Sequence, residues 1–265
     1  MGRSPMIDAE QREQFVRDGF VVVRGLIPGD LAAATAERLL QALEVDPADP
    51  ATWNGKAVTA DLAVIALTEP CRTDAVERAA EALVGSGFVP GLAFSPYLDS
   101  RGVQPNVIRG YIPVLRFPEP GPPVFERPTG FHIDGMHATT LWPDKHFLVV
   151  FAYLTDTAAH GGATAVLPGS HRQVFEHWVR AGHPGSTVPP DLEYAEPVAV
   201  PGGVGDVIFM HYLTVHSGTT NRSDRIRVGL NTAVLPHPER PYRRKKGPPG
   251  PDWTPLDRTL RTDNL

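Results

Sequence analysis

A change of sequence pattern near residue 106 constrains the fold of this chain more than any other feature. Before it, helical periodicity dominates: residues 28–44 form an amphipathic pattern, and residues 73–85 predict a second helix that ends at Gly85. After it, short apolar runs are separated by Pro, Gly and Asn turns, which is typical of all-β domains. The order predicts a mainly β fold with flanking helices, namely a double-stranded β-helix (jelly roll, cupin-like) buttressed by N-terminal helices.

Shorter signals refine this outline. Ile7 to Asp18 reads as a helix with Asp8 as its N-cap, Gly19 ends it, and residues 20–27 read as an early strand. The Gly-rich fragment at residues 202–206 predicts a tight turn before a strand, because it lacks the lysine of a phosphate-binding loop. We expect a single catalytic domain over residues 1–265. Its expected parts are a helix-rich support (1–105), a jelly-roll core carrying the metal site (106–236) and a Pro-rich basic C-terminal tail (237–265).

Two histidines and an aspartate carry most of the chemical information. His132 and Asp134 stand two residues apart in GFHIDGMH, and side chains at that spacing on a strand project to the same face. A distant His216, in GDVIFMHYLTVH, completes a set of two imidazoles and one carboxylate. Such a set leaves one side of a metal ion open and suits non-haem Fe(II) oxygenases. Arg227 follows eleven residues after His216, and its planar fork would pair with the distal carboxylate of a 2-oxo acid.

Several segments of the chain resemble signatures of a known family in the same order. They are FVRDGFVVVRGLIP, GGATAVLPGSH, and GDVIFMH followed by His216, Asn221 and Arg227. From about Phe15 to about Leu235 the chain resembles the phytanoyl-CoA dioxygenase (PhyH-like) family of Fe(II)/2-oxoglutarate-dependent oxygenases. The resemblance implies an enzyme that uses Fe(II), 2-oxoglutarate and O2 and releases succinate and CO2. It also implies the site residues: iron ligands His132, Asp134 and His216, with Arg227 on the distal carboxylate of 2-oxoglutarate.

Details of the motifs narrow these expectations. Many members of the family have a serine two residues after the distal histidine, whereas this chain has Gly218, so the second hydrogen bond to the cosubstrate has no assigned donor. Phe151 and Thr164 are expected beside the cosubstrate. Halogenating relatives have a small residue where this chain retains Asp134, which favours hydroxylation or a related oxidation of a C–H bond. The expected substrate is a small molecule, of which a secondary metabolite is one kind.

The residues that follow the metal motif include three candidates for the substrate pocket: Met136, His137 and Trp142. The alternative is that this segment is a surface loop that packs on itself. His211 is interpreted as structural, His171 as the cap of a turn, and Arg225 as a solvated charge. The tail carries a basic run: Arg240, Arg243, Arg244, Lys245 and Lys246. Such a run usually stays solvated and without regular structure, and the alternative is a lid over an anionic or carrier-bound substrate.

Two other classes of function remain open at this stage. A zinc hydrolase could use the same three ligands without Arg227, and a non-catalytic jelly-roll binding module would need no open metal position. The net charge of −5 gives no reason to expect nucleic acid. One cysteine, Cys71, excludes intrachain disulfides, and no stretch approaches the roughly 18 apolar residues of a membrane span. We therefore expect a cytoplasmic protein with neither a nucleic-acid nor a membrane partner, and make no prediction of its oligomeric state.

Overall fold

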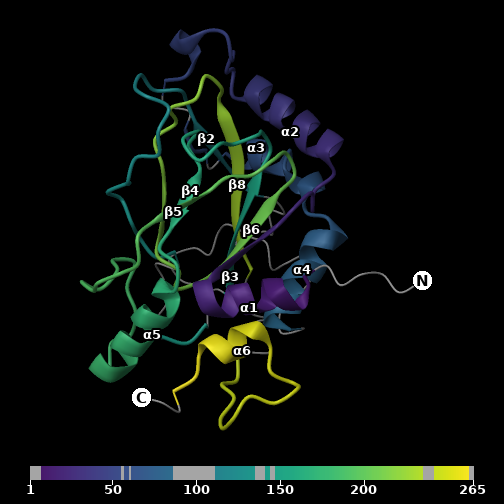
Figure 1. Cartoon of the computed structure of the whole chain (residues 1–265). Helices are drawn as coiled ribbons and strands as arrows, with labels where there is room; N and C mark the ends of the chain where they lie inside the picture. Colours follow the sequence, from purple (N-terminus) through teal and green to yellow (C-terminus); the bar gives the residue numbers. More distant parts are fainter. Residues whose placement is uncertain are drawn as a thin grey trace.

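Two antiparallel sheets form the centre of the molecule (Figure 1). This computed structural model describes residues 7–54, 57–59, 61–85, 111–134, 141–143, 147–234 and 242–262. The larger sheet has the strand order β1-β6-β3-β8-β2, and the smaller has the order β5-β4-β7. The strands are β1 (Phe20–Val23), β2 (Ile112–Arg116), β3 (Leu148–Tyr153), β4 (Thr164–Val166), β5 (Val198–Val200), β6 (Val207–His211), β7 (His216–Gly218) and β8 (Arg227–Val234). The predicted mainly β, jelly-roll fold is confirmed.

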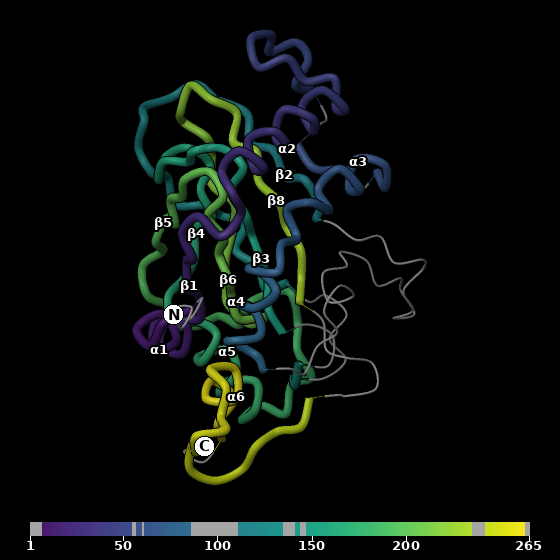
Figure 2. Tube along the Cα trace, turned by 90° about the vertical axis from the view of Figure 1, so that its right-hand side faces the viewer, coloured from purple at the N-terminus to yellow at the C-terminus, as the bar shows by residue number. Residues whose placement is uncertain are grey.

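Helices surround the larger sheet, with α2, α3 and α4 along one side of it and α1 and α6 near one end (Figures 1 and 2). They are α1 (Ala9–Asp18), α2 (Gly29–Ala42), α3 (Leu62–Ala66), α4 (Asp74–Val84), α5 (Ser170–Ala181) and α6 (Pro255–Thr259), with two short 3-10 turns, η1 (Pro50–Thr52) and η2 (Glu69–Cys71). The predicted ends of α1 are confirmed. Asp8 accepts a hydrogen bond from the Gln11 backbone N–H, and Gly19 ends the helix with φ 82°. Among the described residues, no helix combines the length and the apolar character needed to cross a bilayer.

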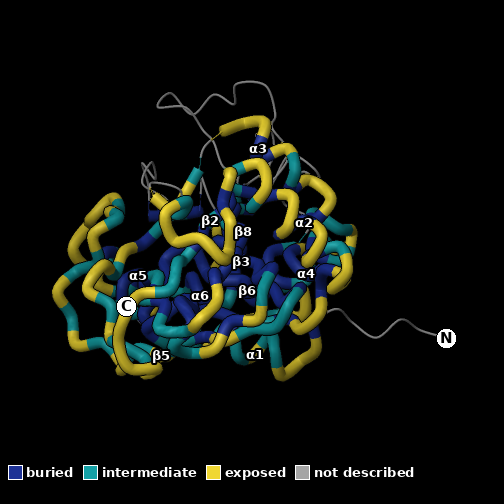
Figure 3. The backbone as a smooth tube through the Cα atoms, turned by 90° about the horizontal axis from the view of Figure 1, so that it is seen from above, coloured by how far each residue is buried: buried dark blue, intermediate teal, exposed yellow. Residues whose placement is uncertain are grey.

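The larger sheet separates two apolar layers. On β3, Val149, Phe151 and Tyr153 belong to a cluster enclosed between the two sheets, which we call the inner core. The alternate residues Leu148 and Val150 belong to the layer that packs against the helices. Because successive side chains of a strand point to opposite faces, a strand buried on both faces reads as a continuous apolar run, as this segment does. Figure 3 shows this buried centre, with exposure concentrated in the peripheral loops.

Helix α5 corrects one interpretation from the sequence. His171 lies in its first turn and is fully buried, so it does not cap a turn. The helix follows Gly169, which has φ 76° and supplies no side-chain cap, and this explains why the usual start signal is missing. Its buried face carries Val174, Phe175 and Trp178, which is the spacing of an amphipathic helix.

The C-terminal segment differs from its expected solvated, irregular state. Within residues 242–262, α6 begins with a capping box between Thr254 and Asp257, and its Leu256 is buried in the helical layer. Helix α6 packs on α1 and α4. At the surface, both guanidinium Nη atoms of Arg258 donate to the Glu13 carboxylate, at 2.6 and 2.8 Å. Helix α6 therefore covers the N-terminal helices α1 and α4.

We predict that burial, rather than the ion pair, holds α6 in place. Leu256→Ala should lower the free energy of unfolding by about 2–5 kcal/mol, because it leaves a cavity in a packed layer. Arg258→Ala should cost only about 0–1 kcal/mol, because its partner Glu13 is largely exposed. Urea unfolding monitored by circular dichroism measures both. Equal losses for the two variants would contradict this account.

Candidate metal centre

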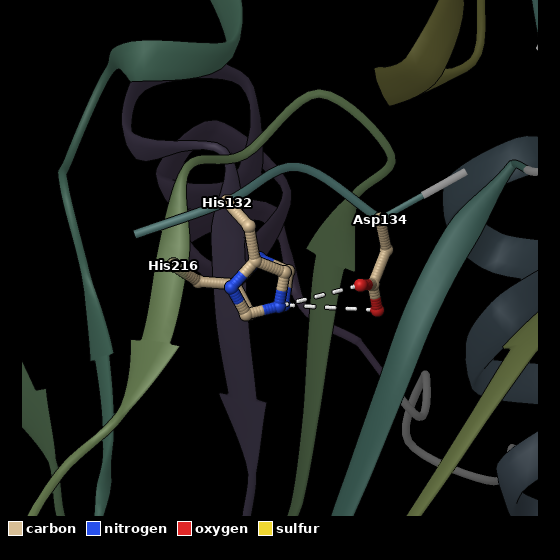
Figure 4. Close-up of side chains that lie close together, drawn as sticks. All are labelled: His132, Asp134 and His216. Atoms are coloured by element: carbon tan, nitrogen blue, oxygen red, sulfur yellow. Dashed lines mark ion pairs between the residues drawn. The ribbon is translucent and has the colours of Figure 1, made fainter. Parts of the chain in front are cut away.

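A short backbone pairing brings the two predicted histidine ligands together. His132 and His216 face each other across an antiparallel bridge, in which each residue's N–H donates to the other's carbonyl oxygen at 3.0 Å. Asp134 lies two residues after His132, so the pleat returns its side chain toward the same side. Figure 4 shows the carboxylate of Asp134 directed at both imidazole rings. Spacing had suggested only the pairing of His132 with Asp134, and the fold brings the distant His216 into contact with them.

The three side chains form a compact set of donor atoms. The Asp134 carboxylate lies 3.5 Å from His132 Nε2 and 3.7 Å from His216 Nε2, and the candidate ligand atoms of the set all lie within 4.8 Å of one another. Metal–ligand bonds of about 2.1 Å at right angles would separate neighbouring donors by about 3 Å. A small contraction would therefore allow one divalent ion to bind all three. Two neutral nitrogens and one carboxylate oxygen suit iron of the non-haem oxygenase type.

The backbone sets the tautomer of each histidine. His132 Nδ1 lies 2.9 Å from the Gly130 carbonyl oxygen, and His216 Nδ1 lies 2.9 Å from the Thr214 carbonyl oxygen. A carbonyl can only accept, so each Nδ1 carries the proton and donates it. Each Nε2 faces Asp134, and in the form without a proton it offers the lone pair that a metal ligand needs.

Charge within the set favours an ionised carboxylate. Burial by itself raises the pKa of Asp134, but the two imidazoles outweigh it and hold that pKa well below its usual range. The hydrogen bond with Asp134 in turn raises the pKa of His132. The site thus holds an ionised carboxylate between two imidazoles. A divalent cation would satisfy the same attraction with greater charge.

Arg227 lies inside the barrel and forms no ion pair with a carboxylate among the described residues. It is 3% exposed, and its Nε and Nη1 atoms are buried with no hydrogen-bond partner among the described residues. Its guanidinium carbon lies 4.9 Å from the centroid of the Phe151 ring. Burial lowers the pKa of Arg227 to about 10, so the group is still charged at neutral pH. A bound anion would stabilise a buried, charged guanidinium that has no hydrogen-bond partner among the described residues.

The other residues predicted for the cosubstrate lie nearby on the inner face. Phe151 packs under Arg227, as noted, and Thr164 pairs with Gly218 across β4 and β7. Tyr153 was not singled out from the sequence, although its hydroxyl donates to the Val200 carbonyl and accepts from the Thr164 N–H, and so ties the two sheets together. An aromatic residue in an apolar run gives no sequence signal for such a role.

The remaining candidate residues separate into three cases. Met136 and His137 lie outside the described residues. Trp142 packs edge-on against Phe175 of α5 and lies under the Arg244 guanidinium, so a place in the substrate pocket stays a prediction. Arg225 is exposed, as expected for a turn tip.

Sequence comparison assigns the family. The model of the phytanoyl-CoA dioxygenase (PhyH) family matches residues 15–229. The chain belongs to this family. It is accordingly an iron- and 2-oxoglutarate-dependent oxygenase, as the donor set and the motifs had indicated. No curated protein matches the chain.

Solved structures share the fold of this PhyH-family member at low sequence identity. AviO1 from Streptomyces viridochromogenes Tue57 is 19% identical, with a TM-score of 0.55 over 91% of this chain and 99% of that one. The epimerase SnoN in complex with Fe3+, alpha ketoglutarate and nogalamycin RO is 20% identical, with a TM-score of 0.53 over 86% and 82%. EvdO2 from Micromonospora carbonacea var. aurantiaca is 18% identical, with a TM-score of 0.53 over 90% and 98%.

Two further buried histidines do not belong to the proposed metal site. The rings of His171 and His211 are 5.0 Å apart, and the N–H of Leu213 donates to His211 Nδ1. Burial lowers the pKa of His171 to about 3 and that of His211 well below its usual range. Both are therefore neutral packing residues at physiological pH, which agrees with the structural interpretation of His211.

We predict that each of the three proposed ligands is required for metal binding. Ala at His132, Asp134 or His216 should abolish stoichiometric binding of Fe(II), because a three-ligand site has no spare donor. His177, exposed on α5, provides the control, and His177→Ala should bind one equivalent. Anaerobic calorimetry and metal analysis measure the outcome. Stoichiometric iron in His216→Ala would show that the distal ligand is wrongly assigned.

The buried pair His171 and His211 predicts a loss of stability in mild acid. Their pKa values are lower in the folded than in the unfolded chain, so the stabilisation is present above the unfolded pKa of about 6.5 and is lost as pH falls toward the folded values. Between pH 7.5 and 5.5 each should cost about 1.4 kcal/mol of unfolding free energy. His171→Gln, which keeps a donor but cannot titrate, should remove its share of this pH dependence. An unchanged slope in urea titrations would contradict the assignment.

Proposed function

We propose that this PhyH-family oxygenase hydroxylates a C–H bond of a small molecule, with His132, Asp134 and His216 as the iron ligands and Arg227 as the partner of 2-oxoglutarate. The observation that carries the proposal is the buried guanidinium of Arg227, which has no partner among the described residues. Removing such a charge from water costs several kcal/mol unless an anion compensates it. The distal carboxylate of a 2-oxo acid bound at the metal would supply that compensation.

This observation also weighs against the two alternatives from the sequence. A zinc hydrolase with the same three ligands would have no use for a buried cation within the barrel. A non-catalytic binding module would have no use for two histidines with matched tautomers aimed at one carboxylate. An enzyme that binds a metal and a dicarboxylic cosubstrate accounts for both the buried guanidinium and the matched tautomers.

The protein's own residues have distinct tasks in this proposal. Iron held by the three proposed ligands, together with 2-oxoglutarate and O2, would supply the oxidising chemistry. The carbonyls of Gly130 and Thr214 keep both imidazoles in the ligand tautomer. Phe151 and Arg227 bind and orient the far end of the cosubstrate, and the apolar inner core excludes water around it. Orientation and electrostatics are thus the contribution of the chain.

The proposed type of reaction rests on Asp134 and on one neighbouring structure, the non-heme monooxygenase ThoJ. A retained carboxylate ligand supports oxygen insertion, since it leaves no place for a halide. One of the solved structures named above, the epimerase SnoN, is an enzyme of nogalamycin biosynthesis. ThoJ, described as a non-heme monooxygenase, is 16% identical, with a TM-score of 0.54 over 84% of this chain and 77% of that one. These names support a secondary metabolite as the substrate class for this chain.

The basic C-terminal run supports a lid role only in part. The Lys245 ammonium lies 3.1 Å from the Asp252 carboxylate and 3.2 Å from that of Asp257, so its charge is already neutralised. Arg244, by contrast, lies over the ring of Trp142, in the segment that follows the metal motif. That contact joins the tail to this segment, and it makes Arg244, rather than Lys245, the lid residue of this proposal.

The decisive experiment separates Arg227 from its exposed neighbour. Arg227→Ala should retain iron but lose about 2–5 kcal/mol of 2-oxoglutarate binding, which is on the order of 30-fold or more in Kd. Arg225→Ala, whose side chain is 78% exposed, should bind as the wild type does. Anaerobic titration of the iron-loaded protein measures binding, and succinate release with O2 uptake measures turnover. A wild-type protein that binds iron but neither binds nor consumes 2-oxoglutarate would overturn the proposed function.

A further inference from the structure

A second arginine faces Arg227 across the sheet. Arg116, the last residue of β2, pairs with Arg227, the first residue of β8. Paired residues of an antiparallel sheet project to the same face. Val114, two residues before Arg116, packs against the inner core, which identifies that face as the interior of the barrel. Two guanidinium groups therefore lie on neighbouring strands in the same enclosed space.

Within the part of the chain that the structure describes, no carboxylate pairs with either of these two arginines. The Nε atom of Arg116 is buried without a hydrogen-bond partner, as are Nε and Nη1 of Arg227, and neither side chain forms an ion pair with a carboxylate of the described chain. After burial itself, the nearby charge of Arg116 is a further cause of the lowered pKa of Arg227. Two like charges held together in a partly dry interior are destabilising until an anion lies between them.

Two glycines make room for the Arg116 side chain. A Cβ atom at Gly162 would lie 2.9 Å from Arg116 Cβ and 3.2 Å from its Cγ, so the stem of the arginine runs against this backbone. A Cβ atom at Gly218 would collide with Arg116 Nη2 and lie 3.1 Å from its Cζ. The head group therefore occupies the place where a side chain at position 218 would stand.

The position of Gly218 connects this head group to the metal centre. Gly218 is two residues beyond His216 on β7, so their side-chain positions share a face of that strand. The backbone of Arg116 is also held in place, because the Asn221 side-chain amide donates to its carbonyl oxygen at 2.9 Å and to that of Arg225 at 2.7 Å. Asn221 thus fixes the end of β2 and the turn that leads into Arg227.

We propose that Arg116 is a second binding residue for the distal carboxylate of 2-oxoglutarate, acting with Arg227 from the space that Gly218 leaves open. The inference rests on the proposed function, which supplies the cosubstrate. One carboxylate has two oxygens with about four acceptor positions, enough for hydrogen bonds from both guanidinium groups. A pair of arginines also selects for the second carboxylate of the ligand, since a monocarboxylic 2-oxo acid would leave both charges unpaired.

The first test compares two ligands that differ in the distal group. Anaerobic, iron-loaded protein is titrated with 2-oxoglutarate and with 2-oxopentanoate, which has the same carbon chain but no distal carboxylate. Arg116→Ala should weaken 2-oxoglutarate binding by about 10- to 100-fold, the usual range for lost hydrogen bonds to a charged group, and leave 2-oxopentanoate binding unchanged. Arg116→Lys should fall between, because it keeps the charge but loses the fork. A merely structural role would change both ligands alike.

The second test uses position 218 to displace the arginine without removing it. Gly218→Ala should reduce the preference for 2-oxoglutarate nearly as much as Arg116→Ala does, and should have no further effect in the Arg116→Ala background. Ser217→Ala, at the adjacent residue whose hydroxyl donates to the Gly218 carbonyl, is the matched control and should retain the wild-type preference. Circular dichroism verifies the fold of each variant, and Arg116→Lys and Gly218→Ala carry the test if Arg116→Ala does not fold.

The two proposals fail in different ways. If Arg227→Ala loses 2-oxoglutarate while Arg116→Ala and Gly218→Ala keep the wild-type preference between the two ligands, the role of Arg116 is overturned and the proposed function stands. If Arg116→Ala and Gly218→Ala instead weaken the binding of 2-oxoglutarate and of 2-oxopentanoate equally, Arg116 is structural and the inference is likewise overturned. If the iron-loaded wild type binds 2-oxoglutarate no better than 2-oxopentanoate, the assignment of both arginines is overturned.

Discussion

The reciprocal backbone hydrogen bonds between His132 and His216 are the constraint on which the rest of the site depends. They join the segment carrying the HxD motif to β7, and β7 is itself paired with β4 in the smaller sheet. The positions of the imidazoles are thus set by main-chain geometry rather than by flexible side chains. Because β7 also carries Gly218, one short strand positions both the proposed ligand His216 and the proposed cosubstrate-binding end of the site. A three-residue strand is precise here because β4 pairs with it along one edge and the bridge to His132 holds its first residue on the other.

The interior of the barrel combines this rigidity with uncompensated charge. Folding places Arg227 in the inner core beside Phe151, although a burial of this kind costs free energy when no anion is present. Such cost is characteristic of sites that are organised for a ligand, because binding then relieves a strain that the fold already holds. The ligand should therefore stabilise the whole domain by mass action, in addition to preparing the metal for chemistry.

The sequence predicted those parts of the protein that follow from local rules. Spacing by two identified His132 and Asp134, capping residues identified α1, and a continuous apolar run identified β3. Arg116 could not be predicted from the sequence, because only the register in which β2 pairs with β8 places it beside Arg227. Helix α5 lacked a polar cap at Gly169. The C-terminal segment was expected to lack regular structure because of its charge and proline content, whereas its packing depends on a few apolar residues such as Leu256.

The contact between the last helix and the first has a consequence for how the chain acquires its structure. Arg258 and Glu13 are 245 positions apart, and α6 covers α1 and α4. A ribosome that makes 5–20 residues per second therefore exposes the N-terminal helices for on the order of ten seconds or more before their cover is available. During this interval the apolar faces of α1 and α4 are open to other partners, chaperones among them. The segment that forms α6 thus leaves the ribosome after all of the described strands.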